Sequence, residues 1–268
     1  MIRPALAAIS LTSVLCAAGV TAVSDGGRDA PPPPEAPARV VLDLTHALGP
    51  DTPAWPEPMF TPFKYQLTAT IDKDGFFAGR YQTPDHLGTH VDAPAHFVAG
   101  QPTVDLLRPA DLVRPAVVID MEAAVAANVD ARLGTDAVRA WERTHGAVPA
   151  GSIVLLRTGW ASRWPDPLRV FGKDAKGVLH FPGFSQEAAA LLVRDRRVVA
   201  LGIDSPSLDY GPSSDYAVHH LTYAAGRYGI ENLADLTRLP ATGATVIVAP
   251  IKIAGGSGGQ ARVLALLP

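Results

Sequence analysis

The sequence predicts a mixed α/β fold, built as one domain with a large share of β-structure. Hydrophobic residues make up 47% of the 268 residues and charged residues 18%, which is enough apolar material for a packed core. Short apolar runs typical of buried strands outnumber the helical stretches and do not alternate strictly with them. A doubly wound parallel sheet is therefore not favoured. No internal repeat or second linker divides the chain after residue 39.

The composition also excludes some classes of protein. The formal net charge is −3 and the Lys and Arg residues form no cluster, which argues against a nucleic-acid partner. The single Cys rules out both a disulfide within the chain and a Cys-rich zinc site. The eight His residues remain as candidates for metal binding and acid–base chemistry.

The first 22 residues have the order of a secretory signal peptide. Arg3 precedes an apolar run over residues 5–20, and small residues follow at 20–22. The run is shorter than the roughly 20 residues of a membrane-spanning helix, so a membrane anchor is the weaker interpretation. Cys16 leaves a lipoprotein as a minor alternative. We expect residues 1–22 to be a leader that is removed, and the mature protein to be periplasmic or extracellular, with no membrane attachment.

Residues 23–39 predict an extended tether, because four consecutive Pro residues at 31–34 favour a polyproline-type conformation over folded structure. The folded domain is then expected over residues 40–268.

Within that domain the expected elements follow from local patterns. Six apolar, β-branched runs predict buried strands: residues 40–44, 116–119, 153–156, 198–203, 245–249 and 262–267. Alternation predicts a half-buried strand at residues 65–71. Helices are expected at 136–144 after a Thr135 cap, at 186–194 after a Ser185 cap, and at 216–225 and 232–239.

Three His and two Asp gather in one segment, residues 85–97. His86, His90, Asp92 and His96 offer imidazole nitrogens and a carboxylate, which bind divalent metals at about 2.0–2.2 Å. The alternative is a polar loop whose side chains bond to the backbone. The density of ligand-type residues favours a Zn or Mn site instead, completed by residues from elsewhere in the chain.

The segment predicts an extended piece rather than a helix. Gly88 and Pro94 both disfavour a continuous helix. In an extended strand His90 and Asp92 point to the same side, while Gly88 lets the chain bend so that His86 can join them. Pro94 then turns the chain and returns His96 to the cluster.

Residues 86–96 resemble the signature H-x-G-T-H-x-D-x-P-x-H of the cyclase superfamily of metal-dependent hydrolases, which includes kynurenine formamidases and isatin hydrolases. The resemblance covers roughly residue 40 to the C-terminus. Further segments that resemble the family are residues 43–46, 51–56, 156–160, 181–184, 202–209, 219–233, 250–252 and 256–262.

The resemblance implies a role for each matching residue. His86, His90 and Asp92 would bind one metal ion, and Asp92 with His219 and Glu231 would hold a second where two are present. The implied cofactor is one or two divalent ions, Zn²⁺ or Mn²⁺.

Other roles carried over are those of His96, as proton donor and acceptor, and of Trp55, as a wall of the substrate pocket. His220 rivals His219 as a ligand, although the spacing to Glu231 favours His219. The resemblance also implies a swivelling β/β/α fold and a homodimer or higher homo-oligomer.

The roles of two carboxylates and three further His residues stay open. Asp204 and Asp209 could orient metal-bound His residues or cap a turn. His46 is at least as readily a structural residue as a functional one, and His145 and His180 are expected to be bystanders.

The expected activity is hydrolysis of a non-peptide C–N bond. The candidate ligands contain no sulfur, which favours Lewis-acid hydrolysis over electron transfer, and no G-x-S-x-G motif signals a serine nucleophile. The resemblance implies an arylformamidase acting on small amides like N-formylkynurenine. The alternatives are ring opening of a cyclic amide, as by isatin hydrolases, and a secreted metal-binding protein without catalysis.

Three features depart from the formamidase pattern: the leader, the inserted-looking stretch 163–180, and Gln260 where the family usually has Pro. They leave the particular substrate open.

Overall fold

The computed structural model describes residues 40–268. The expected signal peptide (1–22) and tether (23–39) lie outside these residues and remain predictions. Among residues 40–268, no helix combines the length and the apolar character needed to cross a bilayer.

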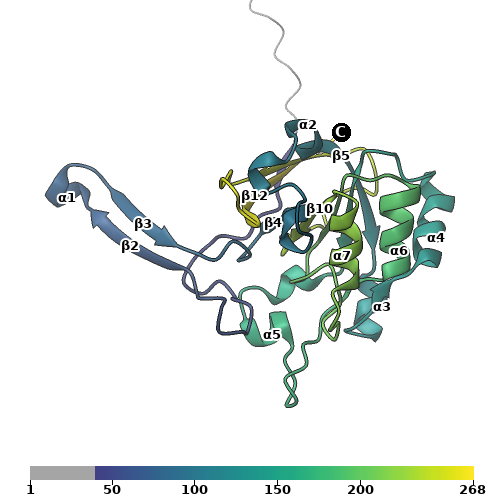
Figure 1. Ribbon diagram of the computed structural model, residues 1–268, viewed down its shortest axis with the longest axis horizontal. Coiled ribbons are helices and arrows are strands. Elements are labelled where there is room, and N and C mark those ends of the chain that lie inside the picture. Colours follow the sequence, from purple (N-terminus) through teal and green to yellow (C-terminus); the bar gives the residue numbers. More distant parts are fainter. Residues whose placement is uncertain (1–39) are drawn as a thin grey trace, which may run out of the picture. The chain divides into compact units, whose positions relative to one another are not determined.

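The core of the fold is a mixed sheet in the order β1-β12-β11-β5-β7-β9-β10-β4 (Figure 1). Strand β4 pairs with β12 as well as β10, so seven strands close a barrel-like circuit and β1 adds to β12 at its side. The pairs β5–β7, β7–β9 and β9–β10 are parallel, and the others are antiparallel. The strands are β1 (Val41–Asp43), β4 (His90–Asp92), β5 (Val113–Asp120), β7 (Ile153–Arg157), β9 (Ala200–Ile203), β10 (Tyr228–Glu231), β11 (Thr245–Pro250) and β12 (Gly258–Leu266).

Alternate residues of the sheet enter two hydrophobic clusters, as expected for strands buried on both faces. Ala116 and Val118 join a cluster that receives residues from all eight strands, whereas Val117 and Ile119 pack against helices. In Figure 1 the helices α3, α4, α6 and α7 lie to one side of the sheet, and α5 lies below it. The helices are α2 (Pro109–Leu112), α3 (Glu122–Ala127), α4 (Thr135–His145), α5 (Pro167–Phe171), α6 (Gln186–Ala190), which continues as a π-helical turn, and α7 (Ala217–Ala224).

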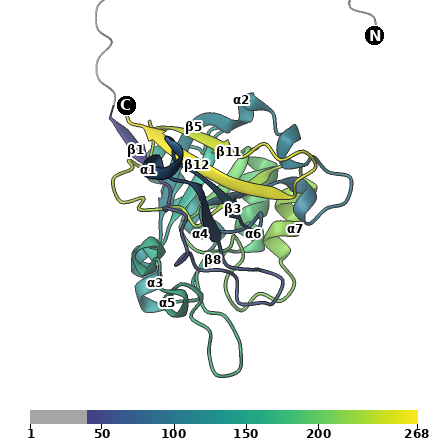
Figure 2. The same ribbon diagram turned by 90° about the vertical axis from the view of Figure 1, so that its left-hand side faces the viewer.

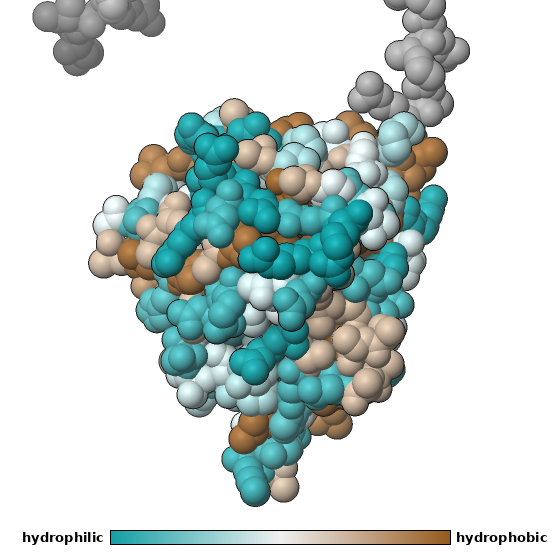
Figure 3. Space-filling view, turned by 90° about the vertical axis from the view of Figure 1, so that its right-hand side faces the viewer, coloured by the Kyte–Doolittle hydropathy of each residue, from teal (hydrophilic) through white to brown (hydrophobic). Residues whose placement is uncertain are grey.

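A hairpin extends away from the sheet (Figures 1 and 2). It consists of β2 (Lys64–Ala69), helix α1 (Ile71–Asp74) and β3 (Ala78–Gln82), and we call residues 64–82 the arm. Its exposed apolar side chains are Tyr65, Leu67, Ile71, Phe76, Phe77 and Tyr81. The face of the molecule beyond α4 and α6 is mostly hydrophilic by contrast (Figure 3). A further short pair, β6 (Arg132–Leu133) with β8 (Gly183–Phe184), is parallel.

The mixed α/β fold class is confirmed, and a strand is present in each of the six predicted runs, although in β1 only Leu42 is buried and Val41 is exposed. Ser185 caps its helix as expected, because its hydroxyl accepts from the backbone N–H of Ala188. The predicted helix at 216–225 is α7.

Three local predictions are wrong. Residues 232–239 form no helix, because Leu233 pairs with Thr45 in an isolated β-bridge and Asp235 closes a turn onto the backbone N–H of Thr237. Thr135 is the first helical residue rather than the cap, which is Gly134. The strand at 65–71 belongs to the arm and is exposed on both faces rather than half-buried.

Candidate metal centre

Strand β4 places two candidate ligands on one side, as its alternation predicts. His90 and Asp92 are two residues apart, and Glu231 of β10 lies directly opposite His90 in the antiparallel ladder. The Nε2 atom of His90 is 3.1 Å from Asp92 Oδ1 and 3.5 Å from Glu231 Oε2. The pairing of β4 with β10 therefore unites two segments that are far apart in the sequence.

His86 reaches the same point through the bend at Gly88, whose φ of 69° lies in the left-handed region that glycine adopts readily. His86 Nδ1 is 2.6 Å from Asp92 Oδ1. A short 3₁₀ turn, Pro94–His96, then brings His96 back, and the His96 ring stacks on His86 with the centroids 3.8 Å apart.

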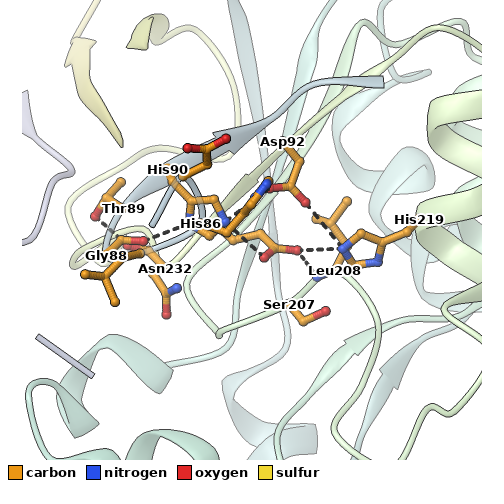
Figure 4. A network of polar contacts seen from close by, with 12 residues as sticks. His86, Gly88, Thr89, His90, Asp92, Ser207, Leu208, His219 and Asn232 are labelled. Atoms are coloured by element: carbon orange, nitrogen blue, oxygen red, sulfur yellow. Dashed lines mark hydrogen bonds and ion pairs between the residues drawn. The ribbon is translucent and has the colours of Figure 1, made fainter. Parts of the chain in front are cut away.

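Helix α7 supplies the remaining imidazole. His219 Nε2 lies 3.1 Å from Glu231 Oε1 and 3.5 Å from Asp92 Oδ2 (Figure 4). Its Nδ1 lies 2.6 Å from Asp209 Oδ2. His220 is exposed, so the structure turns His219 and not His220 toward the cluster. Asp209 thus orients a candidate ligand through its second nitrogen, the arrangement typical of metal-binding histidines.

The cluster is buried and carries concentrated negative charge. Asp92 is 1% exposed and Glu231 5%. Burial opposes protonation of His90, but the nearby carboxylates of Asp92 and Glu231 outweigh it and raise the pKa of His90 to about 9. Burial dominates at His96 instead and lowers its pKa to about 4. The site therefore attracts positive charge while keeping the His96 imidazole neutral at neutral pH.

These residues fit a divalent metal ion. Two groups have ligand atoms close enough to share an ion: His86, Asp92 and His96, and His90, Asp92 and Glu231. His90 Nε2 is buried and has no hydrogen-bond partner within residues 40–268, as expected of a nitrogen reserved for a metal. Asp92 belongs to both groups, but the groups differ from the predicted sets, since they join His96 to His86 and leave out His219. The division of the ligands between ions remains a prediction.

A cavity of about 210 Å³ opens beside the cluster. His86, His90, Asp92, His96, His219 and Glu231 all contribute to its wall. Its other side is aromatic, with Trp55, Phe60, Phe97, Phe171 and Tyr216. Trp55 packs edge-on against Phe171, with ring centroids 5.5 Å apart, so Trp55 both lines the cavity and is fixed in place.

Tyr223 is a functional residue that no sequence motif indicates. Its hydroxyl is completely buried and donates to Asp92 Oδ2 at 2.7 Å across 131 positions of sequence. Tyr223 lies one helical turn after His219 on α7, so a helical spacing from the candidate ligand is the only signal that could have found it.

The C-terminal strand supports His86. Ser257 Oγ lies 3.0 Å from His86 Nε2. Gly258 is needed because a Cβ there would come within 2.6 Å of the His86 ring. The Gln260 amide donates to the carbonyls of Pro84 and Asp85, at 2.6 and 3.1 Å. Gln260 therefore holds the loop that leads into His86.

The remaining candidate residues lie outside the ligand cluster. Asp204 accepts from the backbone N–H groups of Thr158 and Trp160 and does not contact the cluster, so its role is structural. His46 stacks on Trp164, 4.2 Å between centroids, and does not line the cavity. His180 pairs with Asp130 at the surface, and His145 is exposed at the end of α4.

Comparisons with known proteins agree with this geometry. The Cyclase family model matches residues 42–210. The isatin hydrolase of Roseibium aggregatum is 35% identical, over 85% of this chain and 92% of that protein. The kynurenine formamidase of Salinibacter ruber is 28% identical, over 84% and 96%.

Solved structures are similar over the same region. Isatin hydrolase A from Ralstonia solanacearum superposes with a TM-score of 0.82 at 38% identity, covering 86% of this chain and 92% of that one. A protein described as a predicted metal-dependent hydrolase from Bacillus stearothermophilus has a TM-score of 0.63 at 25% identity, covering 85% and 98%.

The fold and the site together define a hydrolase with a buried centre that can hold a divalent metal ion. The chain belongs to the Cyclase family.

Proposed function

We propose that this hydrolase cleaves the amide bond of a small aryl amide, with cyclic amides such as isatin as the first candidate substrates. The observation that carries the proposal is the aromatic cavity that opens onto the ligand cluster. The cavity, whose wall includes Trp55 and Phe97, would hold a flat aromatic ring with its amide carbonyl toward the His and carboxylate side chains. The 35% identity to an isatin hydrolase over most of both chains supports the cyclic amide.

A divalent ion supplies Lewis-acid catalysis when bound, since it polarises an amide carbonyl and lowers the pKa of water to about 7. The chain's own residues provide the rest. Because burial lowers the pKa of His96 to about 4, its imidazole is free to accept the proton of the attacking water. The same imidazole then passes the proton to the leaving nitrogen. Asp209 and Tyr223 hold His219 and Asp92 in place.

The second candidate is hydrolysis of an aryl formamide such as N-formylkynurenine. The 28% identity to a kynurenine formamidase supports it, and the same cavity accommodates an aromatic ring with an open-chain formamide. A metal-binding protein without catalysis is the alternative from another class. The position of His96, stacked on His86 at the cavity wall, supports an enzyme instead.

The test begins with protein from which a chelator has removed the metal. Zn²⁺ or Mn²⁺ is then added, and the hydrolysis of isatin and of N-formylkynurenine is measured. A higher kcat/KM for isatin supports the first candidate, and a higher kcat/KM for N-formylkynurenine the second. Firm metal binding with no turnover of either amide would support the non-catalytic protein.

His96→Ala separates two roles of that residue. Retained metal with lost turnover supports proton transfer, whereas lost metal would make His96 a ligand, which its grouping with His86 and Asp92 allows. Undiminished turnover would contradict both roles. His145→Ala, at an exposed position, is the matched control.

The metal we propose is Zn²⁺ or Mn²⁺, in one or two copies, because imidazole and carboxylate ligands accept both ions. We also propose that the protein is exported after removal of residues 1–22. We also propose a homodimer that forms through the arm. The aromatic side chains of the arm are exposed, and its strands β2 and β3 pair only with one another among the described residues.

A further inference from the structure

Two polar side chains, those of Ser207 and Asn232, line the same cavity as the ligand cluster. Ser207 is only 2% exposed and Asn232 is half-buried. Figure 4 shows both on one side of the cluster, away from β4. A few polar groups in the wall of a largely apolar cavity are typically those that orient a bound molecule, so this hydroxyl and amide indicate a polar subsite.

The backbone at both positions is held firmly. Asn232 has a φ of 52°, in the left-handed region that Asn tolerates better than most residues. Its N–H donates to the Ser205 carbonyl at 3.0 Å, and its carbonyl accepts from Thr89 Oγ1 at 2.6 Å. Ser205 Oγ in turn donates to the Ser207 carbonyl at 3.2 Å. The two side chains are thus aimed by backbone contacts, which leaves their polar atoms free for a bound molecule.

Both residues flank the candidate ligand Glu231. Asn232 follows it in the chain, and Ser207 precedes Leu208, whose N–H donates to Glu231 Oε1 at 2.8 Å. A substrate whose scissile carbonyl lies at the ligand cluster therefore places its neighbouring substituent next to Ser207 and Asn232.

Hydroxyl and amide N–H groups donate to carbonyl oxygens. Isatin and N-formylkynurenine share one such acceptor besides the scissile amide, because each carries a second carbonyl on the aromatic ring, ortho to the amide nitrogen. We propose that Ser207 and Asn232 form a subsite for this second carbonyl, and that they select aryl amides with an ortho carbonyl over those without one. This inference rests on the proposed function.

The test compares two substrates that differ only in that group: formanilide and 2-formamidoacetophenone, which is formanilide with an ortho acetyl group. The measured quantity is the kcat/KM for 2-formamidoacetophenone divided by the kcat/KM for formanilide. Comparing this ratio between wild type and variant removes the difference in intrinsic reactivity between the two substrates. Ser207→Ala and Asn232→Gly, which keeps the left-handed backbone accessible, should each lower this ratio about 10-fold, since a lost hydrogen bond to substrate has effects of that size. The value for formanilide should change little.

A binding measurement complements the kinetics. 2-Aminoacetophenone should inhibit the wild type more strongly than aniline, and the variants should lose that difference. Metal content and Tm should stay close to the wild-type values, because both side chains lie in the cavity wall and neither belongs to the candidate ligands. Ser214→Ala, at an exposed position outside the cavity, is the matched control.

Equal losses for the two substrates, or no loss in either variant, would overturn the subsite while the proposed function stands. If the wild type hydrolyses no aryl amide at all, the proposed function fails and the subsite fails with it.

Discussion

Tyr223 ties helix α7 to the candidate ligand Asp92 through one buried hydrogen bond of 2.7 Å. Partners of this kind orient a metal-binding carboxylate, and their loss typically weakens metal binding about 10- to 100-fold. Tyr223→Phe keeps the buried ring and removes only the hydroxyl. We expect a drop in metal affinity of about that size, measured by competition with a chelating dye. Tyr65→Phe, in the exposed arm, should leave the affinity unchanged. Unchanged affinity in Tyr223→Phe would show that the hydroxyl does not orient Asp92.

Asp204 makes stability depend on pH in a direction opposite to most carboxyls. Burial raises its pKa to about 6, against hydrogen bonds from Thr158 that act the other way. The folded state thus holds the proton more tightly than the unfolded state, whose pKa is about 3.8. Its stabilising contribution is complete below about pH 4 and is lost as the pH rises through about 6.

The Asp204→Asn variant reveals this dependence because Asn does not titrate. Between pH 4 and pH 7 the wild type should lose about 3 kcal/mol of unfolding free energy relative to the variant. Urea unfolding at each pH measures the difference. Asp51→Asn, at an exposed position, should show no such trend. A difference that stays constant with pH would mean that the Asp204 carboxyl is not destabilised by burial.

The arm is an element that the sequence pattern misrepresents. Residues 65–71 alternate as a half-buried strand does, but no other part of the described chain covers either face of β2. The proposed dimer would explain the pattern, because a partner subunit would cover one face of the arm. Replacing Phe76 and Phe77 with Ser should shift a dimer toward monomer, measured by sedimentation velocity. Replacing Val129 and Leu168, exposed apolar residues outside the arm, with Ser is the control. A double Phe variant with an unchanged sedimentation coefficient would contradict a dimer through the arm.

Strands of the closed circuit were the most predictable elements, because their apolar runs enter the core: residues 153–156 are buried on both faces, and Val246 and Val248 of the run 245–249 are buried on one. The helix expected at 232–239 failed for a tertiary reason, since Leu233 is committed to a bridge with Thr45. The candidate ligands of one segment were equally predictable from spacing, and the resemblance supplied His219 and Glu231. Tyr223 was not, because it acts through a contact with Asp92, which is distant in sequence. Ser207 and Asn232 were not, because only the folded chain brings them to the wall of one cavity.

For the whole molecule, removal of the metal should lower stability as well as activity. An ion that binds only the folded state stabilises it by about 4 kcal/mol at a thousand times its Kd. Without an ion, Asp92 and Glu231 remain buried close to one another. Chelation should therefore lower Tm, and Mn²⁺ or Zn²⁺ should restore it, as measured by calorimetry. Glu231→Gln should abolish this response, while His145→Ala should keep it. A Tm that is the same with and without chelator would argue against a metal centre.

The closing of the circuit by β12 has a consequence for how the protein is made. His86, His90 and Asp92 leave the ribosome long before residues 258–260, which pair with β4 and complete the site. Until that last strand docks, the N-terminal ligands can bind metal only as a loose, incomplete group. A nascent or truncated chain that ends before β12 should therefore lack a finished centre, so that the ion is selected by the completed protein and not by the chain as it emerges.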